Sequence, residues 1–163
     1  MMIDDLLDIA HDLAQREKGK PRQASLRRAA STAYYAVFHA LAGLCADELV
    51  GWKKPWSIFS PVYRSLDHNE ARRLFERART SKSYGAEVEK IGSSFLRLQQ
   101  AREEADYDPE PFRYGRDDTL KLVEEARETV AAIKSLEAET RLLLAAHLVT
   151  KRRRNAIADA GRN

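Results

Sequence analysis

The sequence predicts an all-α fold, and three observations lead to that prediction. Apolar residues recur every three or four positions along almost the whole chain, which is the period of an amphipathic helix. Glycine and proline are scarce, with 7 and 5 occurrences in 163 residues, which favours helices over a turn-rich β fold. No segment has the pattern of a β-hairpin. We expect an antiparallel bundle with four main helices plus a short one, and with a long C-terminal helix.

The first two helices are predicted at about residues 3–14 and 25–49, with "GKPR" at 19–22 closing the first. The second contains no charged residue from Ala29 to Ala46. A helix that is uncharged on all sides is buried on most of them. We therefore expect it at the centre of the fold, packed against several neighbours or against a second subunit.

Residues 50–61 contain glycine and two prolines, which predicts a long irregular connection that carries both tryptophans, Trp52 and Trp56. These rings serve either as packing anchors or as a platform on which bases stack. A short helix is expected near residues 69–79, with Asn69 as its N-cap.

The next main helix is predicted at about 86–106, because Pro109 disfavours helix directly before it. The last is predicted from 120 to about 150, with Asp117 or Asp118 as its cap. At about 1.5 Å per residue it would extend for about 45 Å, too far for the other helices to cover completely.

The length is that of one domain, predicted at residues 1–150, followed by a basic tail at 151–163. The tail has five basic residues and one acidic residue, so its net charge of +4 exceeds the +3 of the whole chain, and the remainder sums to −1. Such a run is either a solvated end or an arm that binds phosphate groups.

The composition favours a soluble protein of the cytoplasm. The single cysteine, Cys45, cannot form an intramolecular disulfide, which suits a reducing compartment. The N-terminal segment is acidic and amphipathic and does not have the pattern of a signal peptide. Polar residues such as Tyr34, Tyr35 and His39 make the second helix too polar for a membrane span. The four histidines lack metal-ligand spacing, so neither a metal nor a cofactor is expected.

One arginine occupies a position where the helical pattern requires a core residue. The apolar seam of the 86–106 helix runs through Val88, Ile91, Phe95 and Leu98. Its next two positions are Arg102 and Ala105. Arg102 is therefore either buried in an ion pair with a neighbouring carboxylate, or it lies in a cleft where it contacts phosphate.

A polar ridge is predicted along the second helix, where Arg27, Ser31, Tyr35 and His39 recur every fourth residue. Such a ridge is either a hydrogen-bonded contact between two helices or the lining of a shared cleft.

Two segments together resemble the HEPN family of small prokaryotic helical bundles. These are "RRAASTAYYAVFHALAGL" and, about sixty residues later, "LQQAREEADYDP", and the resemblance extends over roughly residues 1–135. It implies a homodimer, because HEPN domains typically dimerise. Many members are metal-independent endoribonucleases or toxins, often encoded beside a small nucleotidyltransferase that acts as the antitoxin.

The family's active-site motif is an arginine followed, after four to six residues, by a histidine. Arg102 matches the arginine, but Tyr107 stands where the histidine is expected. A tyrosine with a pKa of about 10 is ionised in only about one molecule in a thousand at pH 7, so it is a poor general base. His39 could substitute if the fold brings the two helices together.

These features predict a dimeric module that binds RNA or a nucleotide, is related to toxin–antitoxin systems and lacks the usual motif histidine. The alternative is an active metal-independent endoribonuclease toxin paired with a nucleotidyltransferase antitoxin. The candidate catalytic residues are Arg102, Tyr107 and His39, and the candidate binding residues are Arg27, Ser31, Tyr35 and Asp106.

Overall fold

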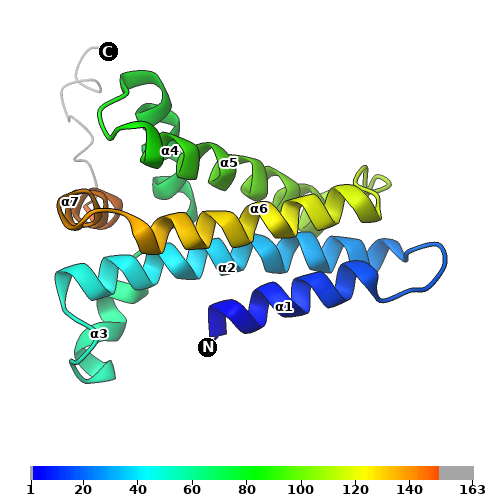
Figure 1. Ribbon diagram of the computed structural model, residues 1–163, viewed down its shortest axis with the longest axis horizontal. Coiled ribbons are helices and arrows are strands. Elements are labelled where there is room, and N and C mark those ends of the chain that lie inside the picture. Colours follow the sequence, from blue (N-terminus) through cyan, green and yellow to red (C-terminus); the bar gives the residue numbers. More distant parts are fainter. Residues whose placement is uncertain (1, 151–163) are drawn as a thin grey trace, which may run out of the picture.

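The computed structural model describes residues 2–150, which form seven α-helices and no strand (Figure 1). The helices are α1 (Met2–Gln15), α2 (Gln23–Leu49), α3 (Trp56–Tyr63), α4 (His68–Ser81), α5 (Ala86–Tyr107), α6 (Arg116–Ser135) and α7 (Ala138–Val149). The predicted all-α helical bundle is therefore confirmed. The predicted basic tail, 151–163, lies outside the described residues.

The uncharged helix α2 forms the centre of the fold (Figure 1). Helices α1, α3, α5, α6 and α7 all contact it, and α1 and α6 lie along much of its length. Fifteen residues of α2 are buried, most of them alanine or larger apolar residues. Helices of the same chain thus supply the burial that the sequence predicts for this helix.

By length and composition alone, α2 also qualifies as a candidate membrane span among the described helices. However, 72% of its most apolar window is buried inside the bundle. Core helices of soluble proteins pass the same test, because they too are apolar on most sides.

The prediction of one long C-terminal helix is wrong. The chain leaves the helical conformation at Leu136 and Glu137, whose ψ angles are 142° and 150°, and α6 and α7 are separate helices. Leu136 is buried at this corner. Arg141 fixes the turn, because its guanidinium donates to the Lys134 carbonyl (3.3 Å) and to the Glu48 carboxylate (2.5 Å) at the end of α2. Tertiary contacts therefore end α6 without any glycine or proline.

The prediction of an irregular connection over residues 50–61 is also wrong in part, because the two-turn helix α3 begins within this segment. Its aromatic rings pack on one another along the helix. The ring centroid of Trp56 lies 5.9 Å from that of Phe59 and 5.8 Å from that of Tyr63. This packing favours a helix despite the proline at position 61.

Two predicted helix caps need correction. Asp67, not Asn69, caps α4, because its Oδ1 accepts hydrogen bonds from the backbone N–H groups of Asn69 (2.9 Å) and Glu70 (3.0 Å). A glycine occupies the N-cap of α6, and Asp117 and Asp118 lie in its first turn instead. There they still interact favourably with the positive end of the helix dipole.

Candidate functional site

Arg102 lies on α5 and points its guanidinium among three tyrosine rings. Its Nη2 donates to the Oη atoms of Tyr35 (2.8 Å) and Tyr107 (3.4 Å). Its Cζ lies 5.7, 5.5 and 5.2 Å from the ring centroids of Tyr34, Tyr35 and Tyr107, which is within the range of cation–π attraction. The side chain of Arg102 is only 13% exposed. We call Arg102, Tyr34, Tyr35, Asp106 and Tyr107 the Arg102 cluster.

Asp106 provides the carboxylate of this cluster. Its Oδ2 lies 3.1 Å from Arg102 Nε and accepts a hydrogen bond from Ser31 Oγ at 3.2 Å. The ion pair with a neighbouring carboxylate, one of the two alternatives for Arg102, is therefore present. Its geometry is imperfect, because the buried Nε makes no hydrogen bond within the described residues. Nη1 has no hydrogen-bond partner in that part of the chain either, so the described residues leave this donor unused.

Arg27, the first residue of the predicted ridge, caps the C-terminal end of α5. Its guanidinium donates to the backbone carbonyls of Glu104 (2.9 Å), Ala105 (3.0 Å), Asp108 (2.8 Å) and Glu110. The last carbonyls of a helix lack partners within the helix and carry its negative dipole end, so a cation stabilises them. Arg27 thus holds in place the helix end that carries Arg102 and Tyr107.

His39, the last residue of the ridge, bonds to α3 and not to Arg102. Its Nδ1 lies 2.7 Å from Tyr63 Oη, and the two rings are stacked with centroids 5.9 Å apart. The His39 ring is 6.4 Å from that of Tyr35, the nearest member of the Arg102 cluster with which it has a ring contact. His39 is therefore a neighbour of the Arg102 cluster and not a member of it.

A second histidine, His68, lies against the Arg102 cluster. His68 begins α4, and its Nδ1 is 2.6 Å from Tyr34 Oη. Its ring stacks on Phe38 at a centroid distance of 4.0 Å. These contacts join segments about 30 residues apart, so no local pattern in the sequence indicates them.

Both histidines have pKa values lowered from 6.5. Burial lowers the pKa of His39. Burial also lowers the pKa of His68, as does the positive charge of Arg102, while Asp67 opposes them. Both imidazoles are consequently neutral at pH 7 and able to accept a proton. Burial raises the pKa of Tyr34, so its hydroxyl stays protonated.

The fold thus brings most of the predicted site residues into one region between α2 and α5. Ser31 and Tyr35 of the ridge contact Asp106 and Arg102 directly, as a hydrogen-bonded ridge at a helix–helix contact would. Tyr107 is the exposed member of the Arg102 cluster. It is 71% exposed, so its ring is accessible to a ligand. The region therefore combines a held guanidinium, accessible aromatic surface and two neutral imidazoles.

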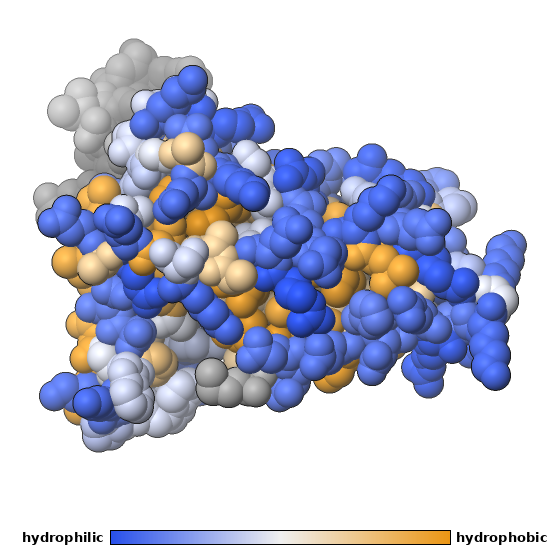
Figure 2. All heavy atoms as spheres, viewed as in Figure 1, coloured by the Kyte–Doolittle hydropathy of each residue, from blue (hydrophilic) through white to orange (hydrophobic). Residues whose placement is uncertain are grey.

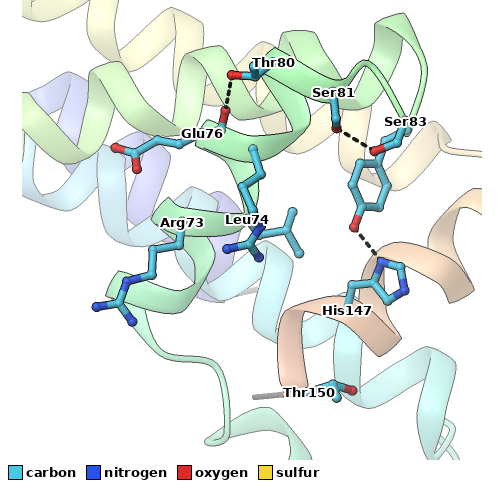
Figure 3. Close-up of a pocket in the computed structure, with 10 residues that line it drawn as sticks. Arg73, Leu74, Glu76, Thr80, Ser81, Ser83, His147 and Thr150 are labelled. Atoms are coloured by element: carbon cyan, nitrogen blue, oxygen red, sulfur yellow. Dashed lines mark hydrogen bonds between the residues drawn. The ribbon is translucent and has the colours of Figure 1, made fainter. Parts of the chain in front are cut away.

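A pocket lies elsewhere, between α4, the loop after it and α7 (Figure 3). Its volume is about 930 Å³, and none of the predicted site residues lines it. At its edge the Tyr84 hydroxyl is 2.5 Å from His147 Nδ1. Arg73, also in its lining, pairs with Glu70 at 2.6 Å. Because the sequence-predicted site residues all lie away from this pocket, we place the candidate site at the Arg102 cluster.

No group of three or more histidine, cysteine or acidic side chains among the described residues could hold a metal ion. No family model, curated protein or solved structure matches the chain.

Proposed function

We propose that the protein is a HEPN-like module that binds RNA or a nucleotide through a phosphate contact at Arg102. One observation carries this proposal: a mostly buried guanidinium, held by tyrosine hydroxyls and rings, leaves its Nη1 without a hydrogen-bond partner in the described residues. Arginine suits phosphate because its planar guanidinium can donate two parallel hydrogen bonds to phosphate oxygens. The exposed Tyr107 ring beside it offers a face on which a base can stack.

The charges around Arg102 support the proposal in spite of the many acidic residues of α5. Glu104 is held by Arg113 through two contacts of 2.8 Å, and Glu103 lies 3.7 Å from Arg72. These pairs partly neutralise the carboxylates that would otherwise repel a phosphodiester. Asp106 remains the competitor, and a bound phosphate would share Arg102 with it or displace it.

Fluorescence anisotropy with a labelled single-stranded RNA and with a labelled mononucleotide tests this proposal. We expect Arg102→Gln to weaken binding at least tenfold, because it removes the charge and the guanidinium while keeping a polar side chain. Arg97→Gln is the matched control, since Arg97 lies on the same helix but is 61% exposed and pairs with Glu125. Equal affinity of the two variants would contradict the proposal.

A metal-independent endoribonuclease is the second candidate, and the two neutral histidines favour it. Cleavage of RNA by its own 2′-hydroxyl needs a base near that hydroxyl and an acid at the leaving oxygen. His39 and His68 flank the Arg102 cluster from α2 and α4, so the role of base has two candidates despite Tyr107 at the motif position, and one of the two imidazoles must be protonated to serve as the acid. RNA cleavage that persists with a chelator and with Tyr107→Phe, but disappears with His39→Ala or His68→Ala, would make the protein an enzyme.

Three further parts of the proposal follow from the family resemblance. We propose a homodimer, with α2 and α5 near its two-fold axis, a location in the cytoplasm, and a nucleotidyltransferase as protein partner in a toxin–antitoxin pair. Light scattering tests the dimer, which requires about twice the chain mass of 18.5 kDa at micromolar concentration. A mass near that of one chain would contradict it.

A further inference from the structure

Both tryptophans of the protein are exposed at one end of the molecule. Trp52, in the turn after α2, is 71% exposed, and Trp56, at the start of α3, is 58% exposed. Within the described residues they therefore are not packing anchors. Helix α3 has no buried residue in the described structure, and the end of the molecule where it lies carries many residues of intermediate hydropathy (Figure 2). Large aromatic rings left in water are characteristic of a binding surface.

Basic side chains accompany these rings. Lys53 and Lys54 lie between the two tryptophans in the sequence, and Lys53 Nζ is 5.4 Å from the centroid of the Trp52 ring. The acidic residues at the end of α2, Asp47 and Glu48, both pair with Arg141. Their negative charge is thus partly neutralised beside the lysines. We call Trp52, Lys53, Lys54 and Trp56 the Trp platform.

A continuous series of ring contacts leads from the Trp platform to the Arg102 cluster. Trp56 contacts Tyr63 at 5.8 Å between centroids, Tyr63 stacks on His39 at 5.9 Å, and His39 lies 6.4 Å from Tyr35. Arg102 then lies 5.5 Å from the Tyr35 ring. The two sites are therefore connected by one aromatic path that runs over α3 and α2.

From this continuity we infer that the Trp platform is a second subsite for single-stranded RNA, at which bases stack while Lys53 and Lys54 contact the backbone phosphates. The inference rests on the proposed function, because it extends the Arg102 site along the strand. Sites for single strands combine aromatic stacking with positive charge, and the Trp platform has two exposed rings and two lysines. Bases in a duplex are already stacked on each other, so double-stranded RNA would not gain from these rings.

The chemistry of the platform fits RNA better than a membrane. A membrane-binding helix presents a long apolar face with basic residues along its other side. Helix α3 has only eight residues, no charged residue and two serines among its apolar side chains. The lysines precede the helix, and Lys53 lies over the Trp52 ring, where a strand that stacks on that ring would place its phosphates.

Intrinsic fluorescence tests the inference directly, because both tryptophans belong to the platform and their emission reports on no other part of the chain. We expect a short oligouridylate to quench this emission at concentrations that saturate its anisotropy, and a duplex of similar length to quench it far less. Trp56→Ala should weaken oligouridylate binding roughly 5- to 150-fold, the range found for loss of one stacked base. Trp56→Phe, which keeps a ring, should retain most of the affinity.

Further measurements separate stacking from other uses of this surface. Ile58 is exposed on the same helix but offers no ring, so Ile58→Ala should leave RNA affinity unchanged. Lys53→Gln and Lys54→Gln should each reduce the log–log salt slope by about 0.7. A tryptophan emission that shifts with anionic phospholipid vesicles but not with RNA would overturn the inference in favour of a membrane. Loss of dimer mass in Ile58→Ala and Trp56→Ala alike would overturn it in favour of a second copy of the chain.

The same experiments distinguish failure of this inference from failure of the proposed function. If Arg102→Gln weakens binding while RNA leaves tryptophan emission unchanged, the Trp platform is wrong and the Arg102 site stands. If RNA quenches the tryptophans but Arg102→Gln binds as well as wild type, the Arg102 site is wrong and the platform stands.

Discussion

Replacing Arg102 with alanine should destabilise the fold more than replacing any surface arginine of α5. The change removes a charged hydrogen bond to Tyr35, the ion pair with Asp106 and contacts with three tyrosine rings. Breaking a fully buried ion pair costs about 3–5 kcal/mol, and a charged hydrogen bond contributes about 1.5–3 kcal/mol. The side chains of Arg102 and Asp106 are 13% and 23% exposed, so water partly compensates the stranded carboxylate. We expect a loss of about 2–3 kcal/mol.

Urea unfolding followed by circular dichroism measures this loss, at a fixed protein concentration so that any dimerisation affects all variants equally. Arg97→Ala is the control, because its exposed pair with Glu125 is of a kind worth only about 0–1 kcal/mol. Asp106→Asn should lie between the two, since it keeps the shape and the Ser31 contact but removes the charge. If Arg102→Ala costs no more than Arg97→Ala, the packing of the guanidinium among the tyrosine rings does not stabilise the fold and the description of the site is wrong.

Three further predictions concern the candidate motif, the histidines and the tail. Tyr107→His rebuilds the arginine–histidine spacing, so it should produce or increase RNA cleavage that a chelator does not inhibit; gel assays showing no gain would argue against a nuclease scaffold. Because His39 and His68 have folded-state pKa values below 6.5, the unfolded state binds more protons as the pH falls through 6.5. The free energy of unfolding should therefore decrease from pH 7 towards the lowered pKa values, and His68→Gln should flatten that dependence in urea titrations; an unchanged slope would contradict burial of the ring. Deleting 151–163 should leave the salt dependence of RNA binding unchanged, whereas a slope reduced by about 0.7 per lost phosphate contact would identify the tail as an RNA-binding arm.

The sequence predicts the helices well where the apolar period is regular. The seam through Val88, Ile91, Phe95 and Leu98 is buried, and it correctly isolates Arg102 as an arginine on the inner side of α5. The ion pair of Arg102 with a neighbouring carboxylate was one of two alternatives open from the sequence, and it is present. Local periodicity and spacing are sufficient for these results, because each depends on residues of one helix.

The features that the sequence does not predict depend on contacts between distant segments. The corner at Leu136 has no glycine or proline, and it exists because Arg141 bonds to both α6 and the end of α2. His68 reaches Tyr34 because α4 packs against α5, which itself packs against α2, and no motif links the two residues. Trp56 is likewise exposed because no residue of α3 is buried in the described structure, and the local sequence of the helix does not predict this.

Photocrosslinking of a single-stranded RNA that contains 4-thiouridine, followed by mass spectrometry of the peptides, tests the central claim most directly, because it locates the RNA on the chain. The Arg102 site predicts crosslinks to the peptide that contains Tyr107, with further crosslinks to the Trp platform if the strand extends along α3. These crosslinks should be lost in Arg102→Gln and kept in Arg97→Gln. Crosslinks confined to residues 151–163, or to the pocket between α4 and α7, would contradict the claim that RNA binds at Arg102.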